Sequence, residues 1–400
     1  MKLIEREYLQ KLIGAIGTPD IKVIAGVRRS GKSKLMEQFI DYLRENYEAA
    51  NVIHINFSLI EFEDLQDYHK LYNYIKSAYK DGLKNFVCID EVQMCENFEK
   101  AINSLHAEEL FDIYLTGSNA FLLSSDIATL FTGRCIEIAV YPFSYSEYLR
   151  YFESEEVISD FDKYFVDGGM SGSYLYQNEE LKLDYVKDIY TTIIERDLIK
   201  RKKIKNKVLL LKIASFLMDN IGNLASANSI ANALSTSQKK VGDKTVGSYI
   251  KALCESFLFY RINRYDIRGK KYLTSNEKYY LCDTSFKYAV LGKKDMNYGR
   301  VYENIVALEL LRRGYEVYVG VLYEKEIDFV AIKRNEKIYI QVSDNISDEN
   351  TFKREVDSLL KIKDAYPKIL IARTHHEEYT YEGIKVVDIA EWLAKNTINT

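Results

Sequence analysis

The octapeptide GVRRSGKS, residues 26–33, has the residue types and the spacing of a loop that holds phosphate groups. Gly26 and Gly31 let the backbone turn so that its N–H groups converge on an anion, and a following helix adds the positive end of its dipole. The ammonium of Lys32 can reach the terminal phosphates, and the hydroxyl of Ser33 can ligate Mg²⁺. The remaining members of the loop are Val27, Arg28, Arg29 and Ser30. The pattern predicts a site for ATP and Mg²⁺.

Such a site also needs an acidic residue at the end of a second strand. The segment NFVCIDEVQ, residues 85–93, supplies four apolar residues followed by Asp90 and Glu91. We expect Asp90 to hold Mg²⁺ through water and Glu91 to act as the general base that polarises the attacking water. Together with the glycine loop upstream, this pair predicts hydrolysis of the nucleotide.

Three further polar residues each leave two interpretations open. Ser118 and Asn119 end the apolar run FDIYLTGSNA, where they could hydrogen-bond the γ-phosphate or the attacking water, or else cap a helix. Arg134 could stabilise charge on the γ-phosphate, in cis or across a subunit interface, or be a structural arginine on a loop.

The elements that position these residues follow from the apolar pattern. Short runs rich in branched residues predict buried strands, and residues 32–46 show the spacing of an amphipathic helix. The expected strands are 21–26, 51–57, 111–120 and 135–140, together with the apolar run that opens 85–93. Strands that alternate with helical segments predict an α/β fold with a parallel sheet.

These motifs, together with LFTGRCIEIAVYPFSYSEYL at 130–149, resemble the AAA+ ATPases. More closely, nearly the whole chain is similar to a family of predicted bacterial and archaeal AAA-type ATPases that end in a C-terminal domain of unknown function. The family's Thr-Gly-Ser-Ser corresponds to residues 116–119 here, and its Gly-Arg to Gly133 and Arg134. The resemblance implies ATP binding and hydrolysis, with the biological task unassigned.

Composition limits the class of protein. The 400 residues are 47% hydrophobic and 28% charged, with a net charge of −4, which is typical of a soluble protein of about two to four domains. No apolar run reaches about 18 residues and the N-terminus lacks a signal-peptide core, so we expect no membrane partner. Five scattered cysteines predict reduced thiols and a cytoplasmic location.

The middle of the chain is basic. Residues 201–290 hold 17 lysines and arginines against 6 acidic residues, which favours an anionic partner. Three apolar helices followed by a hairpin predict a winged helix. The third helix, at 243–262 and running into a strand, is the expected recognition helix, and near its start the sequence offers Lys239, Lys240, Lys244, Thr245, Ser248 and Lys251. The hairpin would add Arg264, Arg268, Lys270 and Lys271 for contacts with phosphates. DNA is the partner we favour, and docking of a protein is the alternative. The aromatic segment 143–200 predicts a helical lid or connector, with a flexible turn at 168–173.

Residues 291–400 show a helix, three strands, a helix and a strand, an order that resembles the PD-(D/E)XK nuclease core. The positions that match the metal site of that family are Glu303, Asp328, Gln341 and Ser343. The resemblance implies that Glu303 and Asp328 could hold a weak second metal. Because Ser343 replaces the family's lysine, we expect a domain without nuclease activity.

The sequence thus predicts a P-loop AAA+ core (1–142), a helical lid or connector (143–200), a winged helix (201–290) and a restriction-endonuclease-like α/β domain (291–400). The function it favours is a Mg²⁺-dependent ATPase with a task on DNA. An ATP-dependent switch that binds protein partners and an ATP-gated nuclease are the alternatives, and a homo-oligomer is left open.

Overall fold

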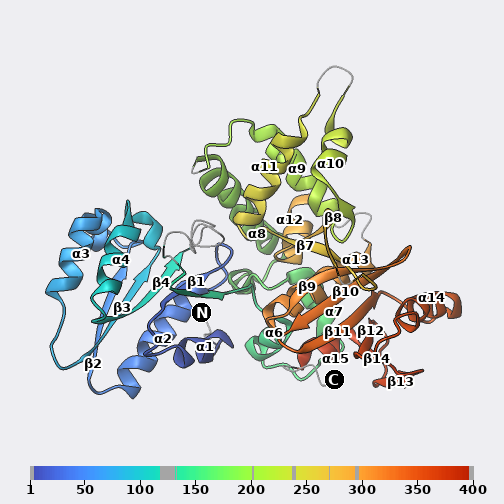
Figure 1. The fold of residues 1–400 in the computed structure, drawn as a ribbon, viewed down its shortest axis with the longest axis horizontal. Coiled ribbons are helices and arrows are strands. Elements are labelled where there is room, and N and C mark those ends of the chain that lie inside the picture. The colour runs from blue at the N-terminus through green and yellow to red at the C-terminus, as the bar shows by residue number, and fades with distance from the viewer. Residues whose placement is uncertain are drawn as a thin grey trace. The chain divides into compact units, whose positions relative to one another are not determined.

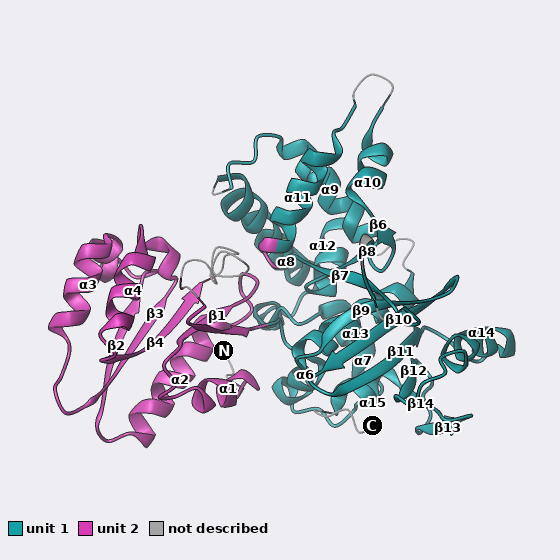
Figure 2. Cartoon of the chain, viewed as in Figure 1, with its two compact units in different colours: residues 1–2, 141–254, 258–400 teal, residues 3–140, 255–257 magenta. Residues whose placement is uncertain are grey.

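The computed structural model describes residues 4–117, 131, 133–200, 202–236, 240–269, 271–292 and 297–395. The chain divides into two compact units (Figure 2). Unit 2 comprises Leu3–Val140 and Glu255–Phe257, and unit 1 comprises Met1–Lys2, Tyr141–Cys254 and Leu258–Thr400. Among the described residues, no helix is both long enough and apolar enough to cross a membrane. All five cysteines are free thiols.

Unit 2 is built on a parallel five-stranded sheet (Figure 1). Its strand order is β2 (Ala50–Asn56), β3 (Lys84–Asp90), β4 (Phe111–Gly117), β1 (Ile21–Ala25) and β5 (Cys135–Ala139), and every neighbouring pair is parallel. The helices of this unit are α1 (Tyr8–Gly14), α2 (Lys32–Asn46), α3 (Tyr68–Ser77) and α4 (Phe98–Ala107), with short 3₁₀ turns η1 (Ile60–Gln66) and η2 (Val92–Met94). The α/β sheet expected for the first part of the chain is therefore confirmed.

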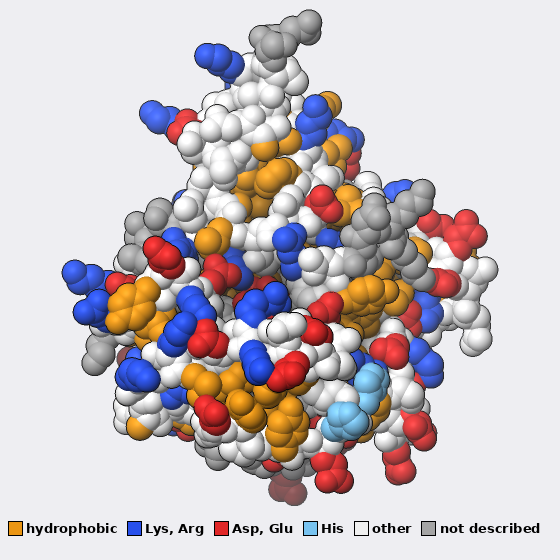
Figure 3. All heavy atoms as spheres, turned by 90° about the vertical axis from the view of Figure 1, so that its right-hand side faces the viewer, with side chains coloured by type: hydrophobic (Ala, Val, Ile, Leu, Met, Phe, Trp, Pro, Cys, Tyr) orange, Lys and Arg blue, Asp and Glu red, His pale blue; other side chains and the backbone are white. Residues whose placement is uncertain are grey.

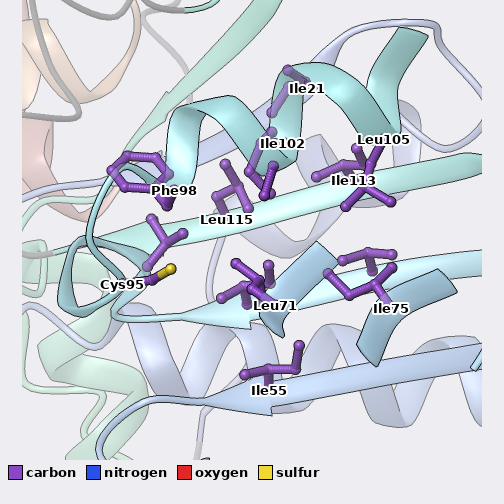
Figure 4. Packing of buried hydrophobic residues seen from close by; sticks show 14 of the residues in the cluster. Ile21, Ile55, Leu71, Ile75, Cys95, Phe98, Ile102, Leu105, Ile113 and Leu115 are labelled. Carbon is purple, nitrogen blue, oxygen red and sulfur yellow. The ribbon is translucent and has the colours of Figure 1, made fainter. Parts of the chain in front are cut away.

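The side chains of this sheet alternate between two apolar faces, as the period of two in a strand requires. On one face, Ile113 and Leu115 of β4 pack with Leu71 of α3 and Ile102 of α4 (Figure 4). On the other face, the ring of Tyr114 lies 4.5 Å from that of Phe39 in α2, measured between centroids. Each fully buried side chain of this size stabilises the fold by about 1.5–3 kcal/mol. Packing on both faces fixes the carboxyl ends of β1, β3 and β4, where the polar residues lie.

Unit 1 begins with helices and ends with a large sheet. The helical elements are α6 (Tyr145–Phe152), α7 (Asp160–Asp167), η4 (Ser171–Leu175), α8 (Glu179–Thr192), the π-helix η5 (Ile193–Lys200), α9 (Lys207–Asp219), α10 (Ala227–Leu234), α11 (Asp243–Glu255), α12 (Thr284–Leu291), α13 (Tyr298–Arg312), α14 (Glu349–Leu360) and α15 (Ile389–Ala394). The nine-stranded sheet runs β13 (Tyr379–Tyr381), β14 (Ile384–Asp388), β12 (Lys368–Ala372), β11 (Glu336–Ser343), β10 (Lys325–Lys333), β9 (Glu316–Leu322), β7 (Phe259–Asp266), β8 (Lys271–Leu281) and β6 (Leu224–Ala225).

This sheet crosses the boundary that the sequence suggests between residues 290 and 291. Strand β7 pairs in parallel with β9, with Arg264 opposite Val319 and Asp266 opposite Val321. The N–H of Ile267 extends the pairing with a 2.9 Å hydrogen bond to the carbonyl of Val321. The β7–β8 hairpin and the strands after residue 315 thus form one sheet, because pairing satisfies backbone groups that a free strand edge would expose.

The glycine-rich segment at 168–173 is not the loose turn expected from its composition. The N–H of Gly169 donates a 2.6 Å hydrogen bond to the buried carboxylate of Asp283, and its carbonyl accepts one of 2.8 Å from Phe143. The hydroxyl of Tyr174 donates to the carbonyl of Gly168 at 2.5 Å. These bonds fix the segment against residues that lie far away in the chain, and such partners leave no local sequence signal.

Candidate nucleotide-binding site and C-terminal carboxylate cluster

The glycine loop connects β1 to α2, as the motif requires. Gly26 has φ 153°, and a Cβ atom at this position would lie 2.1 Å from the carbonyl oxygen of Val140. Gly31 has φ 98° and is the N-cap residue of α2. Only glycine allows this close approach of two backbones together with the left-handed turn into the helix. The loop therefore has the conformation that directs the N-terminus of α2 at an anion.

The ammonium of Lys32 lies inside this loop. It donates hydrogen bonds to the carbonyl oxygens of Gly26 at 3.0 Å and Val27 at 2.9 Å. Ser33 is half-buried in the first turn of α2, and the hydroxyl of Ser30 is buried without a hydrogen-bond partner among the described residues. Arg28 is half-buried and Arg29 is exposed. The loop thus offers a positive charge and hydroxyl groups to a phosphate.

Arg6 also contacts the loop, although no local pattern in the sequence selects it. The residue is 4% exposed, and its guanidinium donates a 2.8 Å hydrogen bond from Nη1 to the carbonyl of Ser30. The same guanidinium lies 5.1 Å from the ring centroid of Tyr8. A single arginine in a charged N-terminal segment has no pattern that would identify this contact.

The acidic residues lie at the carboxyl ends of neighbouring strands. Asp90 ends β3, and its carboxylate oxygen Oδ1 accepts hydrogen bonds from the hydroxyl of Thr116 in β4 and, at 3.1 Å, from the N–H of Glu91. Thr116 is opposite Ile24 of β1, two residues before Gly26. Strand β4 therefore places a hydroxyl between the acidic pair and the glycine loop. In the sequence, Thr116 is only the first residue of the motif at 116–119, and no local pattern indicates that its hydroxyl contacts Asp90.

Glu91 is held in an unusual backbone conformation. It has φ 55° and ψ 42°, a left-handed conformation that costs a non-glycine residue about 1–2 kcal/mol. Its N–H donates at 3.2 Å to the hydroxyl of Thr116, and its carboxylate accepts a hydrogen bond from the side-chain amide of Gln93. Contacts with Thr116 and Gln93 thus offset the strain and orient the carboxylate.

Of the other sequence-predicted residues, the structure describes only Arg134. Ser118 and Asn119 lie outside the described residues. Arg134 is exposed and precedes β5, whose first residue Cys135 is opposite Ile21 at the start of β1. Since β1 and β5 are parallel, Arg134 lies about 15 Å along the strands from the glycine loop. Within one chain Arg134 does not contact this loop, and a role across a subunit interface stays a prediction.

The donor set fits a nucleotide with Mg²⁺. Lys32 and the N-terminus of α2 would compensate phosphate charge, and the hydroxyl of Ser33 and the carboxylate of Asp90 are the hard oxygen ligands that Mg²⁺ prefers. The bound ion would supply charge compensation on the phosphates. Two side chains of the protein orient the acidic pair: the hydroxyl of Thr116 donates a hydrogen bond to Asp90, and the amide of Gln93 donates one to Glu91.

In unit 1, Glu303 and Asp328 do come together, but around a lysine. The ammonium of Lys278, on β8, lies 2.7 Å from Glu303, 2.7 Å from Glu326 and 3.9 Å from Asp328. The hydroxyl of Tyr280 donates to Glu303 at 2.5 Å. Among the described residues, no group of three or more His, Cys, Asp or Glu residues is arranged to hold a metal. The residues present therefore do not fit a metal while the ammonium is in place.

Gln341 and Ser343, the other two positions of the expected nuclease-like site, form hydrogen bonds within the protein. The side-chain oxygen of Gln341 accepts from the N–H of Asp328 at 3.3 Å, and its amide donates to Glu355 at 2.8 Å. Ser343 donates to the carbonyl of Asn345 at 3.1 Å. The period of two along β10 could have identified Glu326 beside Asp328, but no local pattern pointed to Lys278.

Helix α11 carries part of the positive charge of residues 201–290. Lys244, Ser248 and Lys251 are exposed on it and Val246 and Ile250 are buried, while Asp243 and Glu255 are its first and last residues. On the face of the molecule in Figure 3, basic and acidic side chains are mixed, in the upper part as well as below. Lys239 and Lys270, which the sequence also suggested, lie outside the described residues.

Comparisons with known proteins agree with the parallel sheet and the glycine loop described above. Residues 18–149 match the family described as AAA domain, and residues 158–297 match a domain of unknown function, DUF8612. The latter covers the expected connector and winged helix rather than the C-terminal tail. The fold, the glycine loop and this match together define an AAA-domain protein with a nucleotide-binding site.

An uncharacterized protein of Haemophilus influenzae is 40% identical over 98% of this chain and 98% of its own length. Another, from Methanocaldococcus jannaschii, is 29% identical and covers 91% of this chain and 82% of its own length. A Walker-type ATPase of Pyrococcus abyssi has a similar structure, with a TM-score of 0.49 and 16% identity over 72% of this chain and 95% of its own. The chain belongs to the AAA-domain family that includes the Haemophilus influenzae protein.

Proposed function

We propose that this protein is a Mg²⁺-dependent ATPase of the AAA+ type that couples ATP binding and hydrolysis to a task on DNA in the cytoplasm. The observation that carries the proposal is the arrangement of Lys32 within the glycine loop, with Asp90 and Glu91 at the end of β3. Thr116 bridges the two halves of this site from the intervening strand.

In the proposed mechanism, Lys32 exchanges its bonds to the loop carbonyls for contacts with the β and γ phosphates. Asp90 would help to hold Mg²⁺, which would supply charge compensation on the phosphates, and Glu91 would accept a proton from the attacking water. Glu91 is suited to this role because Thr116 and Gln93 fix its backbone and its carboxylate. A fixed base with an aligned water is the main contribution that a protein makes to phosphoryl transfer to water.

The DNA task rests on the surplus of positive charge in residues 201–290, to which the exposed Lys244 and Lys251 of α11 contribute. We propose that this segment is a winged helix, that 143–200 is the helical connector, and that 291–400 is a nuclease-like domain without nuclease activity. Arg134 would act on the γ-phosphate of a neighbouring subunit in a homo-oligomer, because it lies far from the loop of its own chain.

The test is ATP turnover by the full-length protein, measured with and without single-stranded DNA, duplex DNA and RNA. We expect measurable hydrolysis that requires Mg²⁺ and rises with one class of DNA. Hydrolysis that no nucleic acid changes would favour the protein-partner switch, and no hydrolysis under any condition would contradict the ATPase assignment.

A further inference from the structure

The carboxylate cluster of unit 1 is almost closed to solvent. Lys278 is 2% exposed, Glu303 7% and Asp328 9%, whereas the side chain of Glu326 is 37% exposed at one margin of the cluster. The three carboxylates come from two elements, α13 and β10, and the lysine comes from a third, β8. Such a convergence of buried charges is rare unless each is compensated.

We infer that the ammonium of Lys278 takes the place of a divalent cation in this cluster, so that the native chain binds no metal between Glu303 and Asp328. The two oxygens nearest the ammonium are each 2.7 Å away, the length of a charge-assisted hydrogen bond. A Mg²⁺ or Mn²⁺ ion would need to approach the same oxygens to about 2.0–2.2 Å. The ammonium already occupies the position next to these oxygens, so it and a metal ion would compete for the same ligands.

The charge balance keeps the ammonium protonated. Burial lowers the pKa of Lys278, but the charges of Glu303, Asp328 and Glu326 outweigh it, and the pKa is raised above its usual value. Burial and the neighbouring charge of Glu303 raise the pKa of Asp328 well above its usual range, against the opposing effect of Lys278. The geometry accords with an internal counter-charge, since the ammonium lies 2.7 Å from both Glu303 and Glu326.

The hydrogen bonds around the cluster support a structural role for this cation. Glu303 also accepts a bond from the hydroxyl of Tyr280, which lies two residues after Lys278 on the same face of β8. The second carboxylate oxygen of Asp328 accepts a 2.8 Å bond from the N–H of Val342. The ammonium thus joins the β7–β8 hairpin to α13 and β10, a connection that a chelator cannot remove.

The test compares Mn²⁺ binding by full-length wild type, Lys278→Met and Lys278→Met/Asp328→Asn, without nucleotide and in an Asp90→Asn background that removes a carboxylate from the other metal site. Lys271→Met is the matched control, because Lys271 is an exposed lysine on the same strand. We expect no saturable Mn²⁺ signal by electron paramagnetic resonance for wild type and for Lys271→Met. Lys278→Met should bind Mn²⁺ at least about tenfold more tightly, since a unit charge within about 3 Å is removed. Its melting temperature should fall in EDTA and recover with Mn²⁺, and Asp328→Asn should abolish both effects.

Mn²⁺ binding by wild type that Asp328→Asn removes would overturn the inference. So would a folded Lys278→Met protein whose melting temperature and Mn²⁺ signal do not depend on the metal. If Lys278→Met folds only when Mn²⁺ is present, the inference is supported. If Lys278→Met does not fold with or without Mn²⁺, Mn²⁺ binding by wild type and by Asp328→Asn decides the question. Equal absence of a saturable signal in the two supports the inference, and a wild-type signal that Asp328→Asn removes contradicts it.

Discussion

The guanidinium of Arg6 donates a 2.8 Å hydrogen bond to the carbonyl oxygen of Ser30, 24 residues later in the chain. The segment around Arg6 is fixed a second time, by a 2.9 Å hydrogen bond from the side chain of Gln38 in α2 to the carbonyl of Ile4. The glycine loop is thus supported from outside by the segment that precedes the sheet. The shape of the loop depends on more than its own eight residues.

We predict that Arg6→Ala weakens ATP binding about tenfold and destabilises unit 2. The substitution leaves the buried carbonyl of Ser30 without its partner, which costs about 1–3 kcal/mol. Binding of a fluorescent ATP analogue and the melting temperature of the full-length protein would measure both effects. Arg6→Lys is the control, because it keeps the charge and one donor. If Arg6→Ala binds the analogue as tightly as wild type, Arg6 does not support the loop.

Lys32→Ala should abolish tight ATP binding, whereas Glu91→Gln should bind ATP and stop turning it over. Lys32 compensates phosphate charge in the ground state, while Glu91 acts on the attacking water and so affects the chemical step. Equilibrium binding and steady-state hydrolysis separate the two effects. A Glu91→Gln protein that hydrolyses ATP at the wild-type rate would show that another residue is the base.

Thr116→Val should lower the turnover number more than it changes ATP affinity. Valine has nearly the shape of threonine but cannot donate to Asp90 or accept from the N–H of Glu91, so both acidic residues lose a fixed orientation. We expect a loss of about tenfold to a hundredfold in kcat. Thr116→Ser restores the hydroxyl and should recover most of the rate. Equal losses in Thr116→Val and Thr116→Ser would point to packing instead of hydrogen bonding.

Full-length protein should bind duplex DNA with an affinity that falls steeply with salt. Contacts with six or more phosphates would lower the affinity about 10³-fold or more between 50 and 200 mM salt. Lys244→Glu/Lys251→Glu on α11 should weaken binding and reduce the slope by about two. The matched control is Lys353→Glu/Lys361→Glu, the same charge change on α14 and at its C-cap residue. The full chain is needed because β7 pairs with β9, so residues 201–290 lack part of their sheet. Absence of binding at low salt would favour the protein-docking alternative.

The stability of unit 1 should fall as the pH rises from about 4 to 7, because the buried carboxyl group of Asp283 loses its proton in this range. Burial raises the pKa of Asp283 to about 6, although hydrogen bonds from Ser285 and Gly169 lower it. A group whose pKa is higher in the folded state stabilises the fold below its unfolded pKa and loses that contribution as the pH passes the folded pKa. Two pKa units correspond to about 3 kcal/mol as an upper bound.

The measurement is the difference in melting temperature between Asp283→Asn and wild type at pH 4.5 and pH 7. The difference should move in favour of Asp283→Asn by several degrees at the higher pH, because asparagine has no charge to bury. Ser285→Ala is a useful comparison, since it removes one hydrogen bond and keeps the titrating group. A difference that does not change with pH would show that Asp283 titrates normally.

Local patterns in the sequence were sufficient for the nucleotide loop, for the five strands of the sheet of unit 2 and for helix α2. The apolar alternation of β1 and β4 and the glycines at 26 and 31 act over a few residues, so they can be read without knowledge of the fold. The same holds for Asp90 and Glu91, since an acidic pair after a buried strand needs only its immediate neighbours.

The tertiary structure alone decided which distant residues meet. The order of the strands places Thr116 beside Asp90 and moves Arg134 to the far end of β5. Pairing of β7 with β9 unites two segments that the sequence separated, and Lys278 reaches carboxylates 25 or more residues away. Such contacts depend on strand order and on the burial of charge, which are properties of the whole chain and leave no periodic signal in any short segment.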